Sequence, residues 1–132
     1  MTVGSAEQPP LVSVLVPAYN AAKTIGETLA SACSQTHARL EIIVVDDGSV
    51  DETARLVLQA ASEDPRIRLV KQANAGVATA RNTALAHATG EFVAPLDADD
   101  VWRPTKIERQ LKRILGNSNV GMVYCWSLRD QQ

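Results

Sequence analysis

The clearest pattern along this chain is a series of short, nearly continuous apolar runs separated by mixed segments. The runs cover residues 11–16, 40–45, 67–70, 92–96 and 120–124. Strands that are buried on both faces of a parallel sheet read this way, because neither face has to be polar. The pattern therefore predicts five strands, and Pro95 is expected to end the fourth because proline cannot donate to a strand ladder.

Helical patterns fill the segments between these runs. Their predicted buried faces are Ile25, Leu29, Ala32 and Cys33 in the first helix, Ala54, Val57, Leu58 and Ala61 in the second, Ala80, Ala84, Leu85 and Ala88 in the third, and Ile107, Leu111, Ile114 and Leu115 in the fourth. Asn20 is predicted to cap the first helix, and Ser49 with Glu52 has the spacing of a capping box for the second. This alternation predicts right-handed βαβ units, and so a three-layer αβα domain with a mainly parallel sheet.

The composition fits one ordinary globular domain. The length of 132 residues suits a single domain, which we assign to residues 11–132 after a disordered tail at residues 1–10. Hydrophobic residues make up 45% of the chain and charged residues 21%, which are usual values. The net charge of -2 gives no basic surface, and aromatic residues make up only 4%, so nucleic acid is not an expected partner.

Several features point to the cytoplasm. Cys33 and Cys125 lie far apart and outside any CxxC spacing, so reduced thiols are expected. The N-terminal segment lacks the basic and apolar regions of a secretion signal. No apolar stretch approaches the roughly 20 residues that span a bilayer. We therefore expect a cytoplasmic protein with no transmembrane segment.

An acidic cluster follows the apolar run at 92–96. Asp97, Asp99 and Asp100 would repel one another if they were buried together without a counter-charge. Two arrangements avoid this: a solvated turn in which Asp100 caps the next helix, or neutralisation by a divalent cation. Carboxylate oxygens at alternate positions suit Mg²⁺ or Mn²⁺ better than Zn²⁺. The acidic cluster by itself fits both arrangements.

Polar and turn-forming residues also follow the first two predicted strands. These are Pro17, Ala18, Tyr19 and Asn20 after the first, and Asp46, Asp47, Gly48 and Ser49 after the second. In open α/β sheets, ligands bind outside the carboxyl ends of the strands. Asp47 could bond a base or ribose or form only a turn, Tyr19 could stack on a base or fill a gap, and Arg81 could contact a nucleotide or point into solvent.

Three other site types fit less well. No glycine follows the first strand before Gly26, so the GxGxxG pattern of nicotinamide-binding folds is absent. The acidic cluster lacks the glycine and the closing glutamate of an EF-hand loop. The sequence DADDV matches the first motif of aspartyl-phosphate phosphatases, but those enzymes also need a lysine and a second acidic pair well downstream, and no acidic pair follows the motif.

Four motifs together resemble the inverting family 2 glycosyltransferases of the GT-A fold. They are VSVLVPAYN, VVDDGSVDET, NAGVATARNTAL and LDADDVWRPTKIERQL, and the likeness runs from Leu11 to Leu115. The resemblance implies a GT-A fold and a nucleotide-sugar donor, most often UDP-linked. It also implies that the donor is held by Pro17, Ala18, Tyr19, Asn20, Asp47, Arg81, Asp97, Ala98 and Asp99. In this family Asp99 would ligate Mn²⁺ or Mg²⁺ on the diphosphate, and Asp97 would lie near the ribose and the metal.

The resemblance leaves the catalytic base unassigned. In this family the base is an acidic residue of a second half, which also builds the acceptor site, and no such segment precedes Gln132. We therefore expect the chain to be the donor-binding part of a transferase, with little sugar transfer of its own. A non-catalytic nucleotide-binding module is the alternative. The apolar edge that a second half would cover could join two copies in a homodimer.

Overall fold

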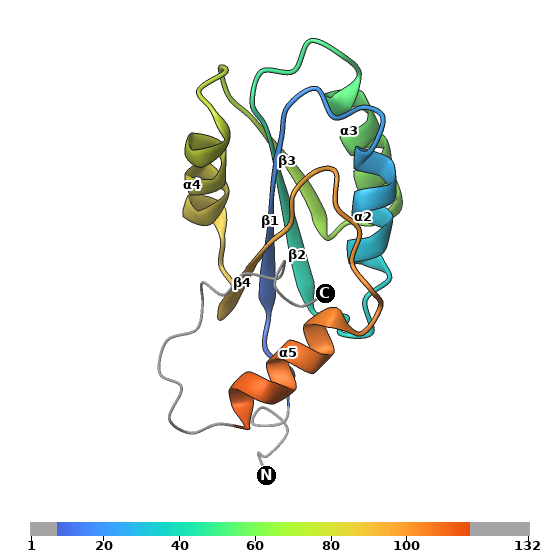
Figure 1. Ribbon diagram of the computed structural model, residues 1–132, viewed down its shortest axis with the longest axis vertical. Helices are drawn as coiled ribbons and strands as arrows, with labels where there is room; N and C mark the ends of the chain where they lie inside the picture. Colours follow the sequence, from blue (N-terminus) through green and yellow to red (C-terminus); the bar gives the residue numbers. More distant parts are fainter. Residues whose placement is uncertain (1–7, 117–132) are drawn as a thin grey trace.

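A four-stranded parallel sheet with helices on both faces makes up the computed structural model, which describes residues 8–116 (Figure 1). The strands are β1 (Val12–Ala18), β2 (Leu40–Asp46), β3 (Ile67–Lys71) and β4 (Phe92–Pro95), in the order β3-β2-β1-β4. The helices are α2 (Ile25–Cys33), α3 (Thr53–Glu63), α4 (Val77–His87) and α5 (Lys106–Leu115). The predicted three-layer αβα fold with a mainly parallel sheet is confirmed, and the predicted strand at 120–124 lies outside the described residues.

The two central strands are buried on both faces, as their apolar runs predict. Along β1, Val14 and Val16 pack in the larger core with α2, α3 and α5, whereas Leu15 packs in the smaller core with α4. β2 alternates in the same way, with Val44 in the larger core and Ile43 in the smaller one. Successive side chains of a strand point to opposite faces, so each core receives every second residue.

Helix α4 covers its face of the sheet alone among the described helices (Figure 1). Ala80 and Ala84, which are fully buried, form its contact line with β1 and β2. Small side chains let the helix approach the sheet closely. Leu85, predicted to face inward, is 47% exposed, because the contact line is narrower than the apolar pattern suggests.

The same reason accounts for two more exposed leucines. Leu58 of α3 is 57% exposed beside the fully buried Val57, and Leu115 of α5 is 59% exposed one turn after the buried Leu111. These two predictions of inward-facing side chains are therefore wrong. A pattern of apolar residues sets the direction of a helix face but not its width.

Strand β4 ends at Pro95 as predicted, and its last bond to β1 is donated by Leu96 N–H to Leu15 O at 2.9 Å. From there residues 96–105 run along α2 to the start of α5 (Figure 1). Of the predicted tail, the structure describes residues 8–10, where Pro10 O accepts a hydrogen bond from His37 Nε2 at 2.8 Å. No helix within residues 8–116 has the length and apolarity to cross a bilayer.

Candidate functional site

The carboxyl ends of β1, β2 and β4 share one edge of the sheet, at the top of Figure 1. Because the strands are parallel, the residues that follow them, Tyr19, Asp47 and the segment 97–100, all emerge at this edge. Ala18 is paired with Asp46 in register, so the loops after β1 and β2 begin side by side. The topology thus gathers the polar residues that the sequence analysis took from three separate strand ends.

Asp47 uses both carboxylate oxygens inside the chain. Its Oδ1 accepts from Gln72 Nε2 at 2.9 Å and from Ala75 N–H at 2.8 Å. Its Oδ2 accepts from Gly76 N–H at 2.9 Å and from Asn74 Nδ2 at 3.2 Å. The bonds from Gln72, Ala75 and Gly76, led by the one from Gln72, hold the pKa of the Asp47 carboxyl below its ordinary value although burial opposes them. Asp47 therefore fixes the 72–76 loop and the start of α4.

Gly48 allows this loop to approach closely. Its φ of 81° lies in the left-handed region, and a Cβ at this position would lie 2.8 Å from Asn74 N. Glycine adopts this conformation at little cost and presents no side chain to the loop. The tight contact between the end of β2 and the 72–76 loop therefore depends on glycine at position 48.

Asn20 links the loops after β1 and β2 and does not cap a helix. The N-cap of α2 is Thr24, so the prediction for Asn20 is wrong. Asn20 has a φ of 49°, which asparagine tolerates better than most residues. Its N–H donates to Ser49 Oγ at 2.8 Å, and its Oδ1 accepts from Val50 N–H at 2.9 Å. A polar partner from another strand end thus outcompetes the local capping role.

The predicted capping box at α3 is also wrong. Ser49 is bonded to Asn20, and Glu52, the N-cap of α3, makes no side-chain cap bond. Asp51 holds the first turn instead, with Oδ1 accepting from Thr53 N–H at 2.9 Å and from Thr53 Oγ1 at 2.6 Å. Asp46 forms a local turn at the end of β2, since its Oδ1 accepts from Ser49 N–H at 3.0 Å.

Residues 97–100 form a turn that is closed by Asp100 N–H donating to Asp97 O at 3.0 Å. Asp99 and Asp100 are exposed, while Asp97 is half-buried. α5 begins at Lys106 with Thr105 as its N-cap, so Asp100 does not cap it. Of the first arrangement considered for the acidic cluster, the solvated turn is therefore present, but the predicted helix cap by Asp100 is wrong.

Arg81 of α4 reaches this turn. Its Nη2 lies 3.4 Å from Asp97 Oδ1, which places a guanidinium beside the acidic cluster. Its Nε is buried and has no hydrogen-bond partner among the described residues. A buried donor without a partner costs free energy unless a ligand or water supplies an acceptor. Arg81 therefore meets the acidic turn from α4 and has a donor left to offer.

The residues that were predicted to follow the first strand differ in exposure, because β1 extends to Ala18. Pro17 and Ala18 are buried within the strand, so they contribute the wall of the edge and not a projecting side chain. Tyr19 is 51% exposed and does not fill a gap in the core. An exposed tyrosine ring at this edge is available to stack on a flat ligand.

The carboxylates of the turn suit a cation that the protein holds only in part. No three His, Cys, Asp or Glu side chains within residues 8–116 are grouped closely enough to hold a metal ion by themselves. Mg²⁺ and similar ions are commonly bound through one or two carboxylates, with substrate phosphates and water as the other ligands. Asp97 and Asp99 fit that kind of site, and they do not fit a closed all-protein metal centre.

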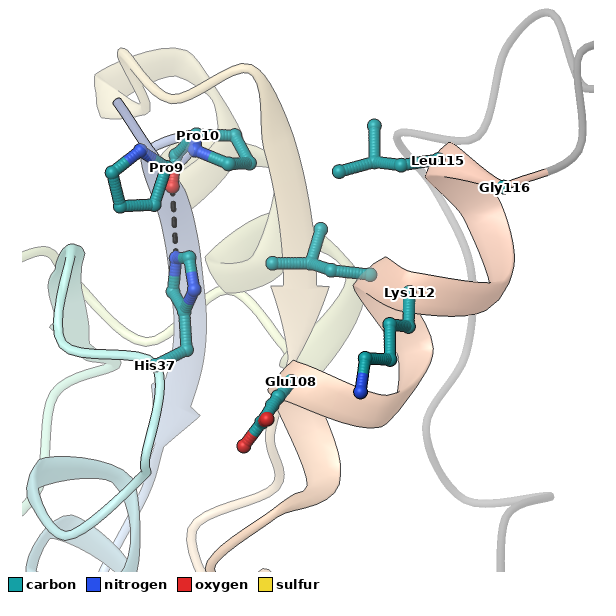
Figure 2. A pocket seen from close by; sticks show the side chains of 8 residues that line it. Pro9, Pro10, His37, Glu108, Lys112, Leu115 and Gly116 are labelled. Atoms are coloured by element: carbon teal, nitrogen blue, oxygen red, sulfur yellow. Dashed lines mark hydrogen bonds between the residues drawn. The ribbon is translucent and has the colours of Figure 1, made fainter. Parts of the chain in front are cut away.

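A separate hollow of about 420 Å³ lies at the opposite end of the sheet, between α5 and the segments that enter β1 and β2 (Figure 2). It is lined by Pro9, Pro10, His37, Glu108, Leu111, Lys112, Leu115 and Gly116. Pro10 and His37 precede their strands, whereas Tyr19 and Asp47 follow them. The hollow is thus remote from the edge that carries the candidate site.

Some residues of the site were not singled out from the sequence. Gln72 and Asn74 hold Asp47, and a polar row on α2 holds the backbone that follows the acidic turn. The row consists of Thr28 and Ser31 within α2, Thr24 at its N-cap and Gln35 just after its C-cap. Its spacing of four, three and four residues places all members on one helix face, which was the signal available in the sequence.

A family model described as "Glycosyl transferase family 2" matches residues 13–131. Among curated proteins, the chain is similar to UDP-Glc:alpha-D-GlcNAc-diphosphoundecaprenol beta-1,3-glucosyltransferase WfgD of Escherichia coli. The two are 44% identical over 115 residues, which make up 86% of this chain and 44% of WfgD. The chain therefore spans less than half the length of this relative.

Two solved structures extend the similarity to the fold. The mannosyltransferase PcManGT from Pyrobaculum calidifontis, in complex with GDP-Man and Mn²⁺, superposes with a TM-score of 0.77 at 38% identity, over 87% of this chain and 35% of that one. S. aureus TarS 1-349 in complex with UDP-GlcNAc superposes with a TM-score of 0.75 at 32% identity, over 81% of this chain and 32% of that one.

Proposed function

Since the chain belongs to glycosyltransferase family 2, we propose that its sheet edge binds a nucleotide-diphospho-sugar donor for inverting transfer of the sugar to an acceptor hydroxyl. The observation that carries the proposal is the meeting of three strand ends at one edge, where Arg81 lies 3.4 Å from Asp97 in the acidic turn. Ligands of open parallel sheets bind at such an edge.

The diphosphate belongs beside the acidic turn in this proposal. Asp99 and Asp97 supply carboxylate oxygens for a divalent cation, Mn²⁺ or Mg²⁺, and Arg81 supplies guanidinium donors for phosphate oxygens. When bound, the cation would offset the negative charge that grows on the departing diphosphate. PcManGT was solved in complex with both GDP-Man and Mn²⁺, which supports a cation at this site.

The nucleoside belongs beside the loops after β1 and β2. Tyr19 offers an exposed ring for stacking, and Asn20 fixes the loop that carries it. Asp47 contributes through the 72–76 loop that its carboxylate holds, because its oxygens already accept four hydrogen bonds. WfgD is described with UDP-Glc and TarS was solved with UDP-GlcNAc, whereas PcManGT was solved with GDP-Man. Two of these three proteins therefore favour UDP as the nucleotide.

The proposal assigns donor binding to the described residues and assigns none of them as the catalytic base. An inverting transfer needs a base within hydrogen-bond reach of the acceptor hydroxyl, on the face away from the departing diphosphate. Asp97 and Asp99 are committed to the donor side and cannot serve from that face. Neither the acceptor site nor the catalytic base is therefore assigned to the described residues.

Calorimetric titration of UDP tests the proposal, with Mn²⁺ in one series and a chelator in the other. We expect one UDP per chain and a tighter affinity with Mn²⁺, since the cation offsets repulsion between diphosphate and carboxylates. Asp99→Asn should remove the Mn²⁺ effect, whereas Asp100→Asn, its neighbour in the same turn, should keep it. Equal affinity in both series, or equal loss in both variants, would overturn the assignment.

A further inference from the structure

The polar row on α2 makes an unusual set of contacts, because all four of its members bond the backbone that runs from the acidic turn to the first turn of α5. Thr24 Oγ1 and Thr28 Oγ1 donate to Ala98 O at 2.9 Å and 2.8 Å. Two hydroxyls, one at the N-cap of α2 and one a turn later within it, thus share a single carbonyl acceptor. That carbonyl belongs to the residue between Asp97 and Asp99.

The other two members of the row, Ser31 and Gln35, bond residues further along the same segment. Ser31 Oγ accepts from Trp102 N–H at 3.1 Å. Gln35 Nε2 donates to Arg103 O at 2.7 Å, and Gln35 Oε1 accepts from Ile107 N–H at 3.0 Å. The side chain of each row member therefore satisfies a backbone group of a segment that has no strand or helix of its own until α5.

Burial shows that these bonds are structural constraints and not surface contacts. Thr28 is fully buried and Gln35 is 6% exposed. The Ala98 side chain is packed against the larger core, so the residue is held from both its carbonyl and its methyl group. An orphaned carbonyl at such a position would carry a desolvation penalty, which makes the threonine contacts hard to replace.

The Ala98 carbonyl sets the direction of the peptide between Ala98 and Asp99. Its neighbour Asp97 closes the turn by accepting from Asp100 N–H at 3.0 Å. If the Ala98 carbonyl turned away from α2, the backbone that carries both carboxylates would rotate with it. The relative placement of Asp97 and Asp99 is therefore tied to two hydroxyls on a different element.

We infer that Thr24 and Thr28 are positioning residues for the cation and diphosphate: they hold Asp97 and Asp99 in the geometry that the donor requires. This inference rests on the proposed donor site, and it adds two residues that touch neither donor nor cation. Partners that orient ligating groups typically change metal affinity by about 10- to 100-fold when they are removed.

The test compares Thr24→Val/Thr28→Val with Thr24→Ser/Thr28→Ser. Valine keeps the branched shape and removes the hydroxyl, whereas serine keeps the hydroxyl. Thr36→Val is the matched control, because Thr36 Oγ1 also bonds this part of the chain, at Glu108 Oε1 and 3.3 Å from Pro104 O, at the opposite end of the segment from the acidic turn. Each protein is titrated with UDP in Mn²⁺ and in chelator, and thermal unfolding is followed in parallel.

We expect the valine pair to leave the metal-free UDP affinity unchanged and to reduce the Mn²⁺ enhancement by about 10-fold or more. The serine pair and Thr36→Val should keep the wild-type enhancement. A purely structural role would lower the unfolding temperature and both UDP affinities together. An enhancement in the valine pair equal to that of the wild type would overturn the inference.

A second readout needs no ligand. Amide hydrogen exchange at Asp100 reports the closing bond of the turn. It should be faster in the valine pair than in the wild type and unchanged in the serine pair and in Thr36→Val. Unchanged exchange in the valine pair would show that the threonines do not hold the turn. A wild-type protein that ignores Mn²⁺ would instead overturn the proposed donor site, so the two failures differ.

Discussion

Arg81 Nη2 lies 3.4 Å from Asp97 Oδ1, so a guanidinium on α4 meets a carboxylate that follows β4. Both side chains are close to half exposed, and an ion pair of this kind adds little to stability. In the proposed donor site, the pair would balance charge at the edge until a cation and a diphosphate supply new partners. Arg81 Nε, buried without a partner among the described residues, is consistent with this reading.

Arg81→Gln should weaken UDP binding by about 10-fold or more, because a charged hydrogen bond to phosphate is lost. The loss should appear with Mn²⁺ and with chelator alike, since Arg81 contacts phosphate and not the cation. The unfolding temperature should change little. Calorimetry and thermal unfolding provide the two measurements.

Arg113→Gln is the matched control for this substitution. Arg113 is an exposed residue of α5, an element at the other end of the sheet. Its substitution should leave UDP affinity unchanged. If both variants lost the same affinity, long-range charge would explain the effect and the specific role of Arg81 would be rejected.

Gly48→Ala should destabilise the protein by about 1–3 kcal/mol, because a strained left-handed residue costs that much. The added Cβ would also meet Asn74 N at 2.8 Å, so the 72–76 loop would have to move away from Asp47. Denaturant unfolding measures the change. UDP affinity should fall with it, since the same loop borders the proposed nucleoside site.

Gly26→Ala is the matched control, and we expect it to change stability in the opposite direction. Gly26 lies within α2, and a Cβ there would have nothing within 4 Å. Alanine in a helix is favoured over glycine by about 0.5–1 kcal/mol, so this variant should be slightly more stable than the wild type. Equal destabilisation by both substitutions would reject the account of Gly48.

Acid should destabilise the protein through carboxyls whose pKa is lowered in the folded state. The bond from Arg66 lowers the pKa of Asp64, the bond from Gln72 leads for Asp47, and the bond from Thr53 leads for Asp51. A lowered pKa contributes stability that is fully present above the unfolded-state value of about 4 and is lost as pH falls below it. The free energy of unfolding should therefore stay level between pH 5 and 7, values well above about 4, and drop as the pH falls further.

Asp64→Asn checks the largest of these contributions. Asp64 Oδ2 lies 2.8 Å from Arg66 Nη2, and the variant removes this ion pair. Its unfolding free energy should be lower than that of the wild type at pH 7 and should fall less steeply below about pH 4. Parallel curves for the two proteins would show that this ion pair does not contribute to the acid sensitivity.

Strand positions were predictable because burial on both faces leaves an unbroken apolar run in the sequence. The sequence also placed Tyr19, Asp47 and Asp99 at one edge, since strand–helix alternation fixes the direction of parallel strands. Helix caps were not predictable in the same way. Asn20 satisfied every local rule for a cap, yet its partner is Val50, which lies 30 positions further along the chain.

The exposure of the leucines and the role of the polar row could not be predicted from the sequence, for a related reason. Periodicity shows which way a helix face points, but only packing decides that Leu85 falls outside the contact line of α4. Thr28 looked like an ordinary helix residue until the segment after β4 was placed against it. Contacts between distant segments are set by tertiary structure, and one sequence read locally does not contain them.

The central claim is that the donor binds at the carboxyl edge of the sheet, and paramagnetic mapping of bound Mn²⁺ tests it most directly. Amide resonances of the labelled protein are recorded with UDP and Mn²⁺, and with UDP and diamagnetic Mg²⁺ as the reference. We predict that Mn²⁺ broadens the amides of residues 97–100 most strongly and those near Gly76 next, while Lys112 and Leu115 stay sharp. Broadening centred on the hollow beside α5, or no selective broadening when UDP is bound, would contradict the account.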